Sequence, residues 1–286
     1  PQARTATDTY GPSDRPTSQV KTTVGSDRTA RSETRTRNQQ GTLQLTGGQI
    51  TYANGGRASI SYTGNAGSER RDRVIYTSSD GTVRLSGEDF TQLEGQLSTS
   101  NIGVGTFLSV AAREGIDNPT VNDQGVLVDG DRKVRADAGN NIWVLEDDNV
   151  RIQVSGNIIT EYSGDVTLNT ANNIAQPVYG RDSTITINEY TIDPNKPNNR
   201  ILRSTERIRN ENGVLVESTN VAYNYGANGQ IDNFDITSTT SSGTTRLTNV
   251  RLVNDPGSLF NNMYQFTASD GVCVAGCYIG DGGRVY

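Results

Sequence analysis

Short runs of residues in which apolar and polar side chains alternate recur along most of this chain, and clusters of turn-forming residues separate them. The clearest example lies in residues 140–170. Val150, Ile152 and Val154 alternate with polar residues there, and a Ser-Gly-Asn turn leads into the next alternating run at 158–162. A period of two residues is typical of β-strands, and Gly and Asn reverse the chain between strands. This stretch is therefore predicted to be an antiparallel meander.

The only tryptophan of the chain, Trp143, lies in the first strand of this meander. Its neighbours Ile142, Val144 and Leu145 are also large and apolar. Because such side chains gather in protein interiors, Trp143 is the candidate centre of a core.

The same organisation extends over the body of the chain. Strand-like runs return about every 8–12 residues from Gly41 onward, the spacing found in β-sandwiches and β-barrels. We expect an all-β, mostly antiparallel fold, in which a meander with a sandwich-like or barrel-like body of one or two units follows an extended N-terminal arm. The expected divisions are an arm at 1–40, a β region at 41–130 and a β region at 131–286. The two β regions either stand apart or form one continuous domain.

Residues 86–97 are the segment that most favours a helix. Ser86 can cap the first turn, and Phe90, Leu93 and Leu97 follow helical spacing. Glycines within the segment limit its length.

Residues 107–113 fit either a short helix or a strand with both faces buried. Ile102, Val104 and Thr106, which come just before them, already alternate with a period of two. We therefore predict a strand here.

The first 40 residues differ in composition from the rest of the chain. They contain few apolar side chains and three prolines, and their net charge is +3, whereas the remaining residues carry −9. A segment of this kind cannot bury enough apolar surface to fold alone, so we expect a partner surface to order it. Opposite charges favour contact between arm and body, within one chain or between neighbouring copies. A solvated tail is the alternative.

Two pieces of the arm show the alternation of a strand. A period of two in a polar segment indicates an edge strand or a strand added to another sheet. Neither piece has the large apolar anchors of a tightly inserted donor strand. The residues expected to make the assembly contact are Val20, Thr22, Val24, Arg31, Arg35 and Arg37.

The chain contains no histidine. This excludes Ser-His-Asp and Cys-His catalysis and most transition-metal sites. Nothing selects a pair of carboxylates for glycoside hydrolysis among the glutamates of the strand regions, and acidic residues are common on the wet faces of sheets. These glutamates are Glu146, Glu161, Glu189, Glu206 and Glu217. We therefore expect no catalytic residue, no cofactor and no enzymatic activity.

Acidic turns are the candidates for a calcium site. They lack the spacing of an EF-hand, and Asp and Asn are ordinary turn residues, so no metal is expected. The turn residues concerned are Asp129, Asp131, Asp147, Asp148, Asn149, Asp270 and Asp281.

Cys273 and Cys277 are the only cysteines. Two thiolates without histidine cannot complete a tetrahedral zinc site within one chain. If the stretch between them bends, a disulfide can close the small loop, whereas full extension would place the two Cα atoms about 13 Å apart. We predict the intrachain disulfide, with free thiols and an interchain bond as alternatives. A disulfide would agree with export from the cell.

Several classes of partner are disfavoured. No apolar run is long enough for a membrane span. The arginine-rich arm also contains acidic residues and the body is acidic, which argues against nucleic acid. Tyrosines are plentiful and could contact a glycan, although in strands they usually pack against neighbours. The chain begins at Pro1 without a methionine, which fits a mature exported product.

These observations predict a secreted structural protein, located outside the cell or at its surface. We expect self-assembly into a filament or fibre, with copies of the same chain as partners, through strand addition by the arm at 1–40. A glycan-binding or receptor-binding β module, such as a phage-fibre-like adhesin, is the alternative function. An arm folded back on its own body is the alternative arrangement.

Overall fold

The computed structural model describes residues 3–10, 16–25, 28–178, 183–193, 196–211, 214–253, 264–268 and 277–279. The chain divides into two compact units, Pro1–Asp148 and Asn149–Tyr286. Strands dominate both units, two helices lie in the first, and the strands in each sheet pair antiparallel with their neighbours. The prediction of an all-β, antiparallel body is confirmed.

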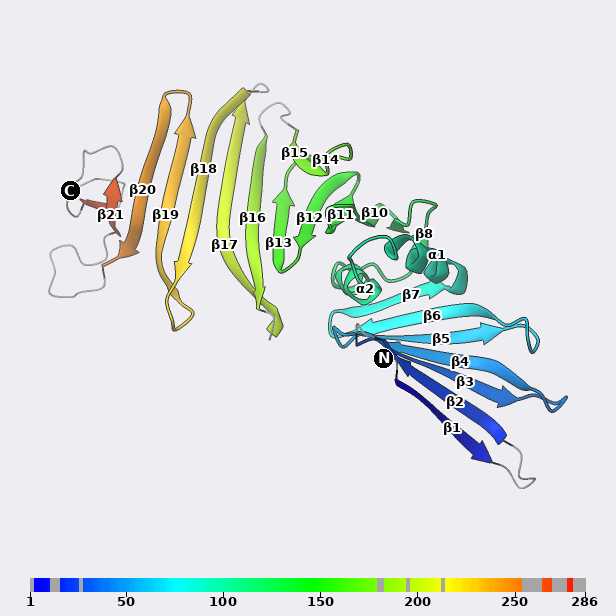
Figure 1. Cartoon of the computed structure of the whole chain (residues 1–286). Helices are drawn as coiled ribbons and strands as arrows, with labels where there is room; N and C mark the ends of the chain where they lie inside the picture. Colours follow the sequence, from blue (N-terminus) through cyan, green and yellow to red (C-terminus); the bar gives the residue numbers. More distant parts are fainter. Residues whose placement is uncertain are drawn as a thin grey trace. The chain divides into compact units, whose positions relative to one another are not determined.

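The first unit contains a sheet of seven strands that follow one another in chain order (Figure 1). Each strand pairs with the next through a hairpin connection, so the sheet is a simple meander. The strands are β1 (Ala3–Tyr10), β2 (Pro16–Val24), β3 (Ala30–Arg37), β4 (Leu43–Thr51), β5 (Arg57–Thr63), β6 (Arg70–Ser78) and β7 (Gly81–Ser86).

The predicted helix is present as α1 (Gly87–Leu97). Ser86 caps it, because its Oγ accepts a hydrogen bond of 3.0 Å from the backbone N–H of Asp89. Phe90, Leu93 and Leu97 are buried, as helical spacing places them on one face.

The strand predicted at 107–113 is wrong, because these residues belong to a second helix, α2 (Val104–Arg113). Phe107, Val110 and Ala111 have the spacing of one helical face, and all three are buried. The alternation that favoured a strand, from Ile102 to Thr106, runs into the first turn of this helix and does not continue beyond it.

The core of the seven-stranded sheet covers only part of its width. Both helices contact β6 and β7. The buried apolar side chains of the sheet come only from β4 to β7, and they are Ile50, Ala58, Ile60, Val74, Tyr76, Val83 and Leu85. None of the described side chains in β1, β2 or β3 is buried. These three strands therefore extend the sheet beyond its core.

Four shorter strands complete the first unit. They are β8 (Thr120–Val121), β9 (Leu127–Asp129), β10 (Arg132–Ala136) and β11 (Asn141–Glu146), and each pairs with the next. In β11 the exposed fraction of Trp143 is 1 %, and its neighbours from Ile142 to Leu145 are buried as well. The expectation that Trp143 lies in a core is confirmed.

Asp137 closes the turn between β10 and β11. Its Oδ1 accepts hydrogen bonds from the backbone N–H groups of Gly139 at 2.7 Å and Asn141 at 3.0 Å. Its Oδ2 accepts from Nε1 of Trp143 at 2.7 Å. Burial by itself raises the pKa of Asp137, but the hydrogen bonds from Asn141 and Trp143 outweigh it and hold the pKa below its usual value.

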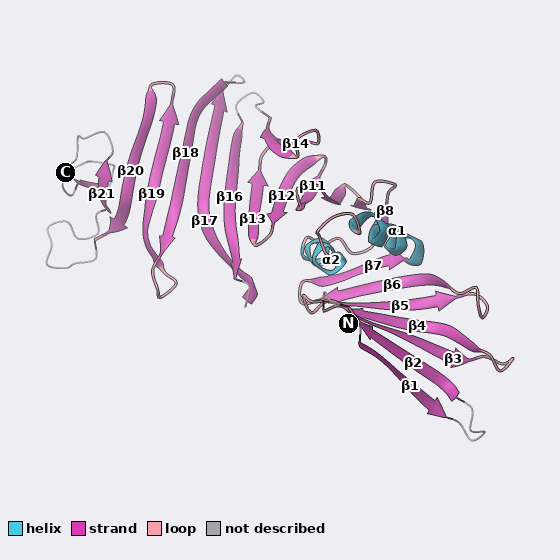
Figure 2. Cartoon of the chain, in the orientation of Figure 1, coloured by secondary structure: helices cyan, strands magenta, loops and turns pink. Residues whose placement is uncertain are grey.

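The second unit is a sheet in which β16 to β20 are the longest strands (Figure 2). Neighbouring strands along it are β12, β13, β16, β17, β18, β19, β20, β21 and β22, and the β14–β15 hairpin pairs with β12. Their bounds are β12 (Asn149–Ser155), β13 (Ile158–Ser163), β14 (Val166–Asn169), β15 (Ile174–Pro177), β16 (Thr184–Asp193), β17 (Lys196–Glu211), β18 (Val214–Tyr225), β19 (Ile231–Thr240), β20 (Gly243–Leu252), β21 (Tyr264–Ala268) and β22 (Cys277–Ile279).

The middle of this sheet has little buried surface. From β18 to β20, Val250 is the only buried residue, and no helix occurs in the part of this unit that the structure describes. Among the described residues, the terminal strands of each sheet do not pair with each other. Thr, Ser and charged residues on both faces leave no continuous apolar face for a second layer to cover.

Candidate functional site

The residues expected to make an assembly contact lie in two neighbouring strands of the first unit. Val20, Thr22 and Val24 belong to β2, and Arg31 and its two companions Arg35 and Arg37 belong to β3. Both pieces are strands, as the alternation predicts. They pair with each other and, through β4, with the rest of the sheet of the same chain.

The two groups occupy opposite faces of the sheet. Val20 and Val24 lie opposite Thr34 and Ala30 in the register, on one face. Arg31 and Arg35 alternate with these residues and therefore lie on the other face. The six residues thus form no single cluster.

One ion-pair network joins this segment to the body of its own unit. Glu94 of α1 accepts hydrogen bonds from two arginines. Its Oε1 lies 3.0 Å from Nη2 of Arg31, and its Oε2 lies 2.6 Å from Nη1 of Arg71. Arg71 also lies over the ring of Phe90, 5.3 Å from its centroid. The Arg31 side chain is 52 % exposed, so its contact with Glu94 contributes at most about 1 kcal/mol.

The other two arginines make local contacts. Nη2 of Arg35 lies 3.9 Å from Oε2 of Glu33 on the same strand, and both side chains are exposed. Arg37 donates a hydrogen bond to the backbone oxygen of Gly41 in the following turn. The contact between Arg35 and Glu33 buries neither charge, because both side chains stay exposed.

The outermost strand, β1, was not predicted. Thr5, Thr7 and Thr9 alternate with Arg4, Ala6 and Asp8, and this period of two was the available signal. Because β1 has no large apolar residue before Tyr10, this alternation gave no hydrophobic signal for a strand. The side chains from residue 4 to residue 10 are exposed, and within the described part of the chain no strand pairs with the outer edge of β1. An open edge presents unpaired backbone N–H and C=O groups to solvent.

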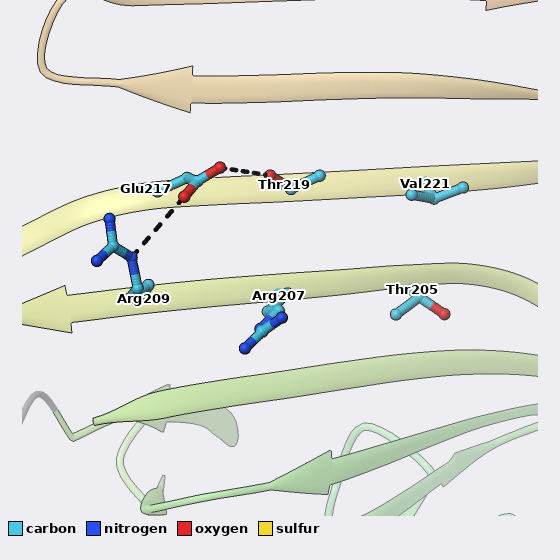
Figure 3. A pocket seen from close by; sticks show the side chains of 6 residues that line it. All are labelled: Thr205, Arg207, Arg209, Glu217, Thr219 and Val221. Atoms are coloured by element: carbon cyan, nitrogen blue, oxygen red, sulfur yellow. Dashed lines mark hydrogen bonds and ion pairs between the residues drawn. The ribbon is translucent and has the colours of Figure 1, made fainter. Parts of the chain in front are cut away.

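A surface pocket lies on one face of the second unit, over β17 and β18 (Figure 3). Its lining residues form three cross-strand pairs in the register, and they are Thr205 with Val221, Arg207 with Thr219, and Arg209 with Glu217. Glu217 accepts a hydrogen bond from Thr219 at 3.3 Å, and its Oε2 lies 3.8 Å from Nε of Arg209. Arg207 is exposed and makes no ion pair within the described residues.

Aromatic side chains continue the pocket face toward the C-terminal strands. Tyr223 follows Val221 by two residues in β18, so both lie on the same face. The ring of Tyr223 is 6.2 Å from that of Phe234 in β19, which is 6.1 Å from that of Tyr264 in β21. Tyr264 is 43 % exposed. An aromatic surface of this kind can pack against a ligand or against a neighbouring chain.

Four of the five glutamates considered for catalysis have hydrogen-bond or ion-pair partners in the structure. Glu161 pairs with Arg200, Glu146 lies 3.3 Å from Nε of Arg132, and Glu206 accepts a hydrogen bond from Ser218 at 2.8 Å. Glu217 belongs to the pocket described above. Burial and, to a smaller extent, the charge of Glu189 raise the pKa of Tyr162.

The side chains of two acidic turns make hydrogen bonds or an ion pair within the chain. Asp129 accepts hydrogen bonds from the backbone N–H groups of Asp117 and Asn118 at 3.0 and 3.2 Å. Asp148 lies 2.5 Å from Nζ of Lys133. Within the described residues there is no group of three or more His, Cys, Asp or Glu side chains that could hold a metal ion.

The predicted disulfide lies outside the described residues. They include the backbone of Cys277 in β22, but neither its side chain nor Cys273. Asp270 and Asp281 also lie outside them. The pairing of the two cysteines therefore stays a prediction.

Comparison with known proteins assigns no family to this chain. No protein-family model matches this sequence, and no curated protein matches it. Among the described residues, neither helix has the length and apolar character needed to cross a bilayer.

Proposed function

We propose that this chain is a secreted structural subunit that assembles with copies of itself into a filament or fibre outside the cell or at its surface. Strands β1 to β3 make the contact with the neighbouring copy by strand addition. The chain needs no cofactor for this role and carries out no catalysis. The disulfide predicted between Cys273 and Cys277 supports the extracellular location, since such bonds persist in oxidising compartments.

The observation that carries the proposal is the lack of a core under β1, β2 and β3. No described side chain in these strands is buried, whereas β4 to β7 supply all the buried apolar side chains of this sheet. Strands without a hydrophobic face are marginal by themselves and depend on the backbone hydrogen bonds of their neighbours. A second sheet edge can supply such bonds without a close fit of side chains. The three strands therefore suit an assembly contact better than a role in stability.

Charge gives further support. Residues 1–40 carry a net charge of +3 and the remaining residues −9, so the segment of one copy is attracted to the body of another at moderate salt. The contact between Arg31 and Glu94 is an instance of this attraction within one chain.

Deletion of residues 1–38 tests the proposal. We expect the shortened chain to stay monomeric under conditions in which the full chain forms large particles, measured by light scattering and electron microscopy. Its first unit should still fold, because the buried residues of the sheet begin at Ile50. The fluorescence of Trp143 during urea unfolding serves as the control for folding. A shortened chain that assembles as the full chain does would refute the linking role.

A glycan-binding function is the second candidate, and the pocket of Figure 3 favours it. Arg207 offers hydrogen-bond donors beside threonine hydroxyls, and Tyr223 lies further along the same face. If this function holds, a glycan array gives a specific signal that falls about tenfold or more in Arg207→Ala, because hydrogen bonds to charged groups are strong. Arg84→Ala, an exposed arginine of β7, is the matched control and should leave the signal unchanged. An array without signal would remove this candidate.

A further inference from the structure

On the open edge of β1, the positive charge of Arg4 lies two residues before Ala6, and the negative charge of Asp8 lies two residues after it. Arg4, Ala6 and Asp8 lie on the same face of the sheet, opposite Thr23, Lys21 and Gln19 of β2 in the register. Ala6 stands midway between the arginine and the aspartate. A strand with this pattern is complementary to a second copy of itself that runs antiparallel to it.

We propose that two copies of the chain join their β1 edges antiparallel about a two-fold axis at Ala6, so that each Arg4 lies opposite the partner's Asp8. This inference rests on the proposed function and specifies the contact. The arrangement is isologous, since the same strand contributes from both copies, and it joins two seven-stranded sheets into one continuous sheet. A filament then needs a second contact elsewhere on the chain.

The side chains involved are available. Arg4 makes no ion pair within the described residues. Asp8 accepts one hydrogen bond, from Nε2 of Gln19 at 3.0 Å on its Oδ1, and a carboxylate has room for further donors. On the opposite face the same register places Thr5 against the partner's Thr7, and Thr–Thr pairs between strands are favourable.

The charges also select the register. An isologous antiparallel pair must place residues of the same face opposite each other, which leaves shifts by two residues as the alternatives. Two such shifts of one strand along the other in one direction place Arg4 opposite the partner's Arg4. Two shifts in the other direction place Asp8 opposite the partner's Asp8. Like charges directly opposite are destabilising, and the intermediate registers lose both ion pairs. The register centred on Ala6 pairs opposite charges twice.

The edge lacks three of the features that keep edge strands apart. No lysine or proline occurs within β1, and its one irregularity in pairing with β2 lies at its end, between Thr9 and Tyr10. Lysines, prolines and central bulges are the common means by which proteins prevent edge-to-edge contact. Exposed charges that match those of a second copy instead permit one specific contact.

Charge exchange at the two positions tests this contact. In Arg4→Asp both copies present two aspartates, and in Asp8→Arg both present two arginines, so each variant should self-associate at least about tenfold more weakly than the unchanged chain. A mixture of the two variants restores both opposite-charge pairs and should associate about as well as the unchanged chain. The double variant R4D/D8R should self-associate as well. Sedimentation velocity on the full chain at low salt measures all four.

Arg57→Asp is the matched control, because it changes the charge by the same amount at an exposed position of β5, outside the strands that make the contact, and should leave association unchanged. Two results would overturn the inference: single variants that associate as the unchanged chain does, or single variants that fail to associate even when mixed. An unchanged chain that stays monomeric would overturn it as well. If the 1–38 deletion abolishes assembly while the charge variants do not alter it, strand addition stands and the two-fold contact falls.

Discussion

Replacing Asp137 with alanine is expected to lower the free energy of unfolding of the first unit by about 3 kcal/mol. The substitution leaves the buried Nε1–H of Trp143 without its acceptor and removes the bonds to the backbone N–H groups of Gly139 and Asn141. Because Trp143 is the only tryptophan, its fluorescence during urea unfolding reports on this unit alone. Such a reporter matters in a chain of two units, whose global unfolding need not be two-state.

Two further variants test whether the lost hydrogen bonds of Asp137 cause this loss of stability. Asp131→Ala removes an exposed aspartate from the preceding turn and should change stability by no more than about 0.5 kcal/mol. Asp137→Asn keeps an oxygen that can accept from Trp143 and should cost less than Asp137→Ala. Equal losses in all three would contradict the role assigned to Asp137.

Asp137 also makes stability depend on pH in a defined direction. The pKa of its carboxyl is held below its usual value in the folded chain, because the hydrogen bonds outweigh the effect of burial. Its contribution is therefore fully present above the unfolded pKa of about 3.9 and is lost as the pH falls through the lower pKa of the folded state. We expect the Asp137→Ala variant to lose less stability than the unchanged chain when the pH is lowered through this range.

Replacing Gly105 with alanine is the second change with a large expected effect, a loss of about 2–3 kcal/mol from the first unit. An ideal Cβ at this position would lie 2.5 Å from Cγ and 2.6 Å from Cβ of Tyr52. These atoms are close to the backbone of β4, so that a simple rotation of the ring cannot relieve the clash. The backbone oxygen of Gly105 also accepts a buried hydrogen bond of 3.0 Å from the hydroxyl of Tyr76, which a shift of α2 would strain.

Gly95→Ala is the matched control for this substitution. Gly95 lies inside α1, and its added Cβ would meet no atom within 4 Å. Here the higher helix propensity of alanine should raise stability by about 0.5–1 kcal/mol. Opposite signs for the two variants in urea unfolding are the expected result, and a gain at both positions would contradict the close packing of α2 on Tyr52.

The elements that could be predicted from the sequence are those whose pattern and packing agree. Ser86 and the spacing from Phe90 to Leu97 identified α1, and the apolar run around Trp143 identified β11. The second helix was missed because Ile102, Val104 and Thr106 alternate by chance just before it, while the helical face that decides the structure begins at Phe107. A short apolar run does not separate a buried helix from a buried strand.

The candidate site was predictable only in part, for a related reason. The strands at β2 and β3 were predicted, but β1 was not, because backbone pairing and not burial forms it. An alternation of Thr with Arg, Ala and Asp has no hydrophobic signal. Strand spacing did not predict how the strands divide between the sheets, since it is the same whether or not a second layer covers the strands.

The contacts between neighbouring strands from β16 to β20 determine how this sheet can change in width. Each of these strands packs chiefly against the two strands beside it, as the units of a repeat protein do. Removing or inserting one complete hairpin would therefore leave no cavity and would return the next strand to the same direction and the same face. A sheet built in this way can be widened or narrowed by whole hairpins, each of which changes the width of the sheet by about 10 Å.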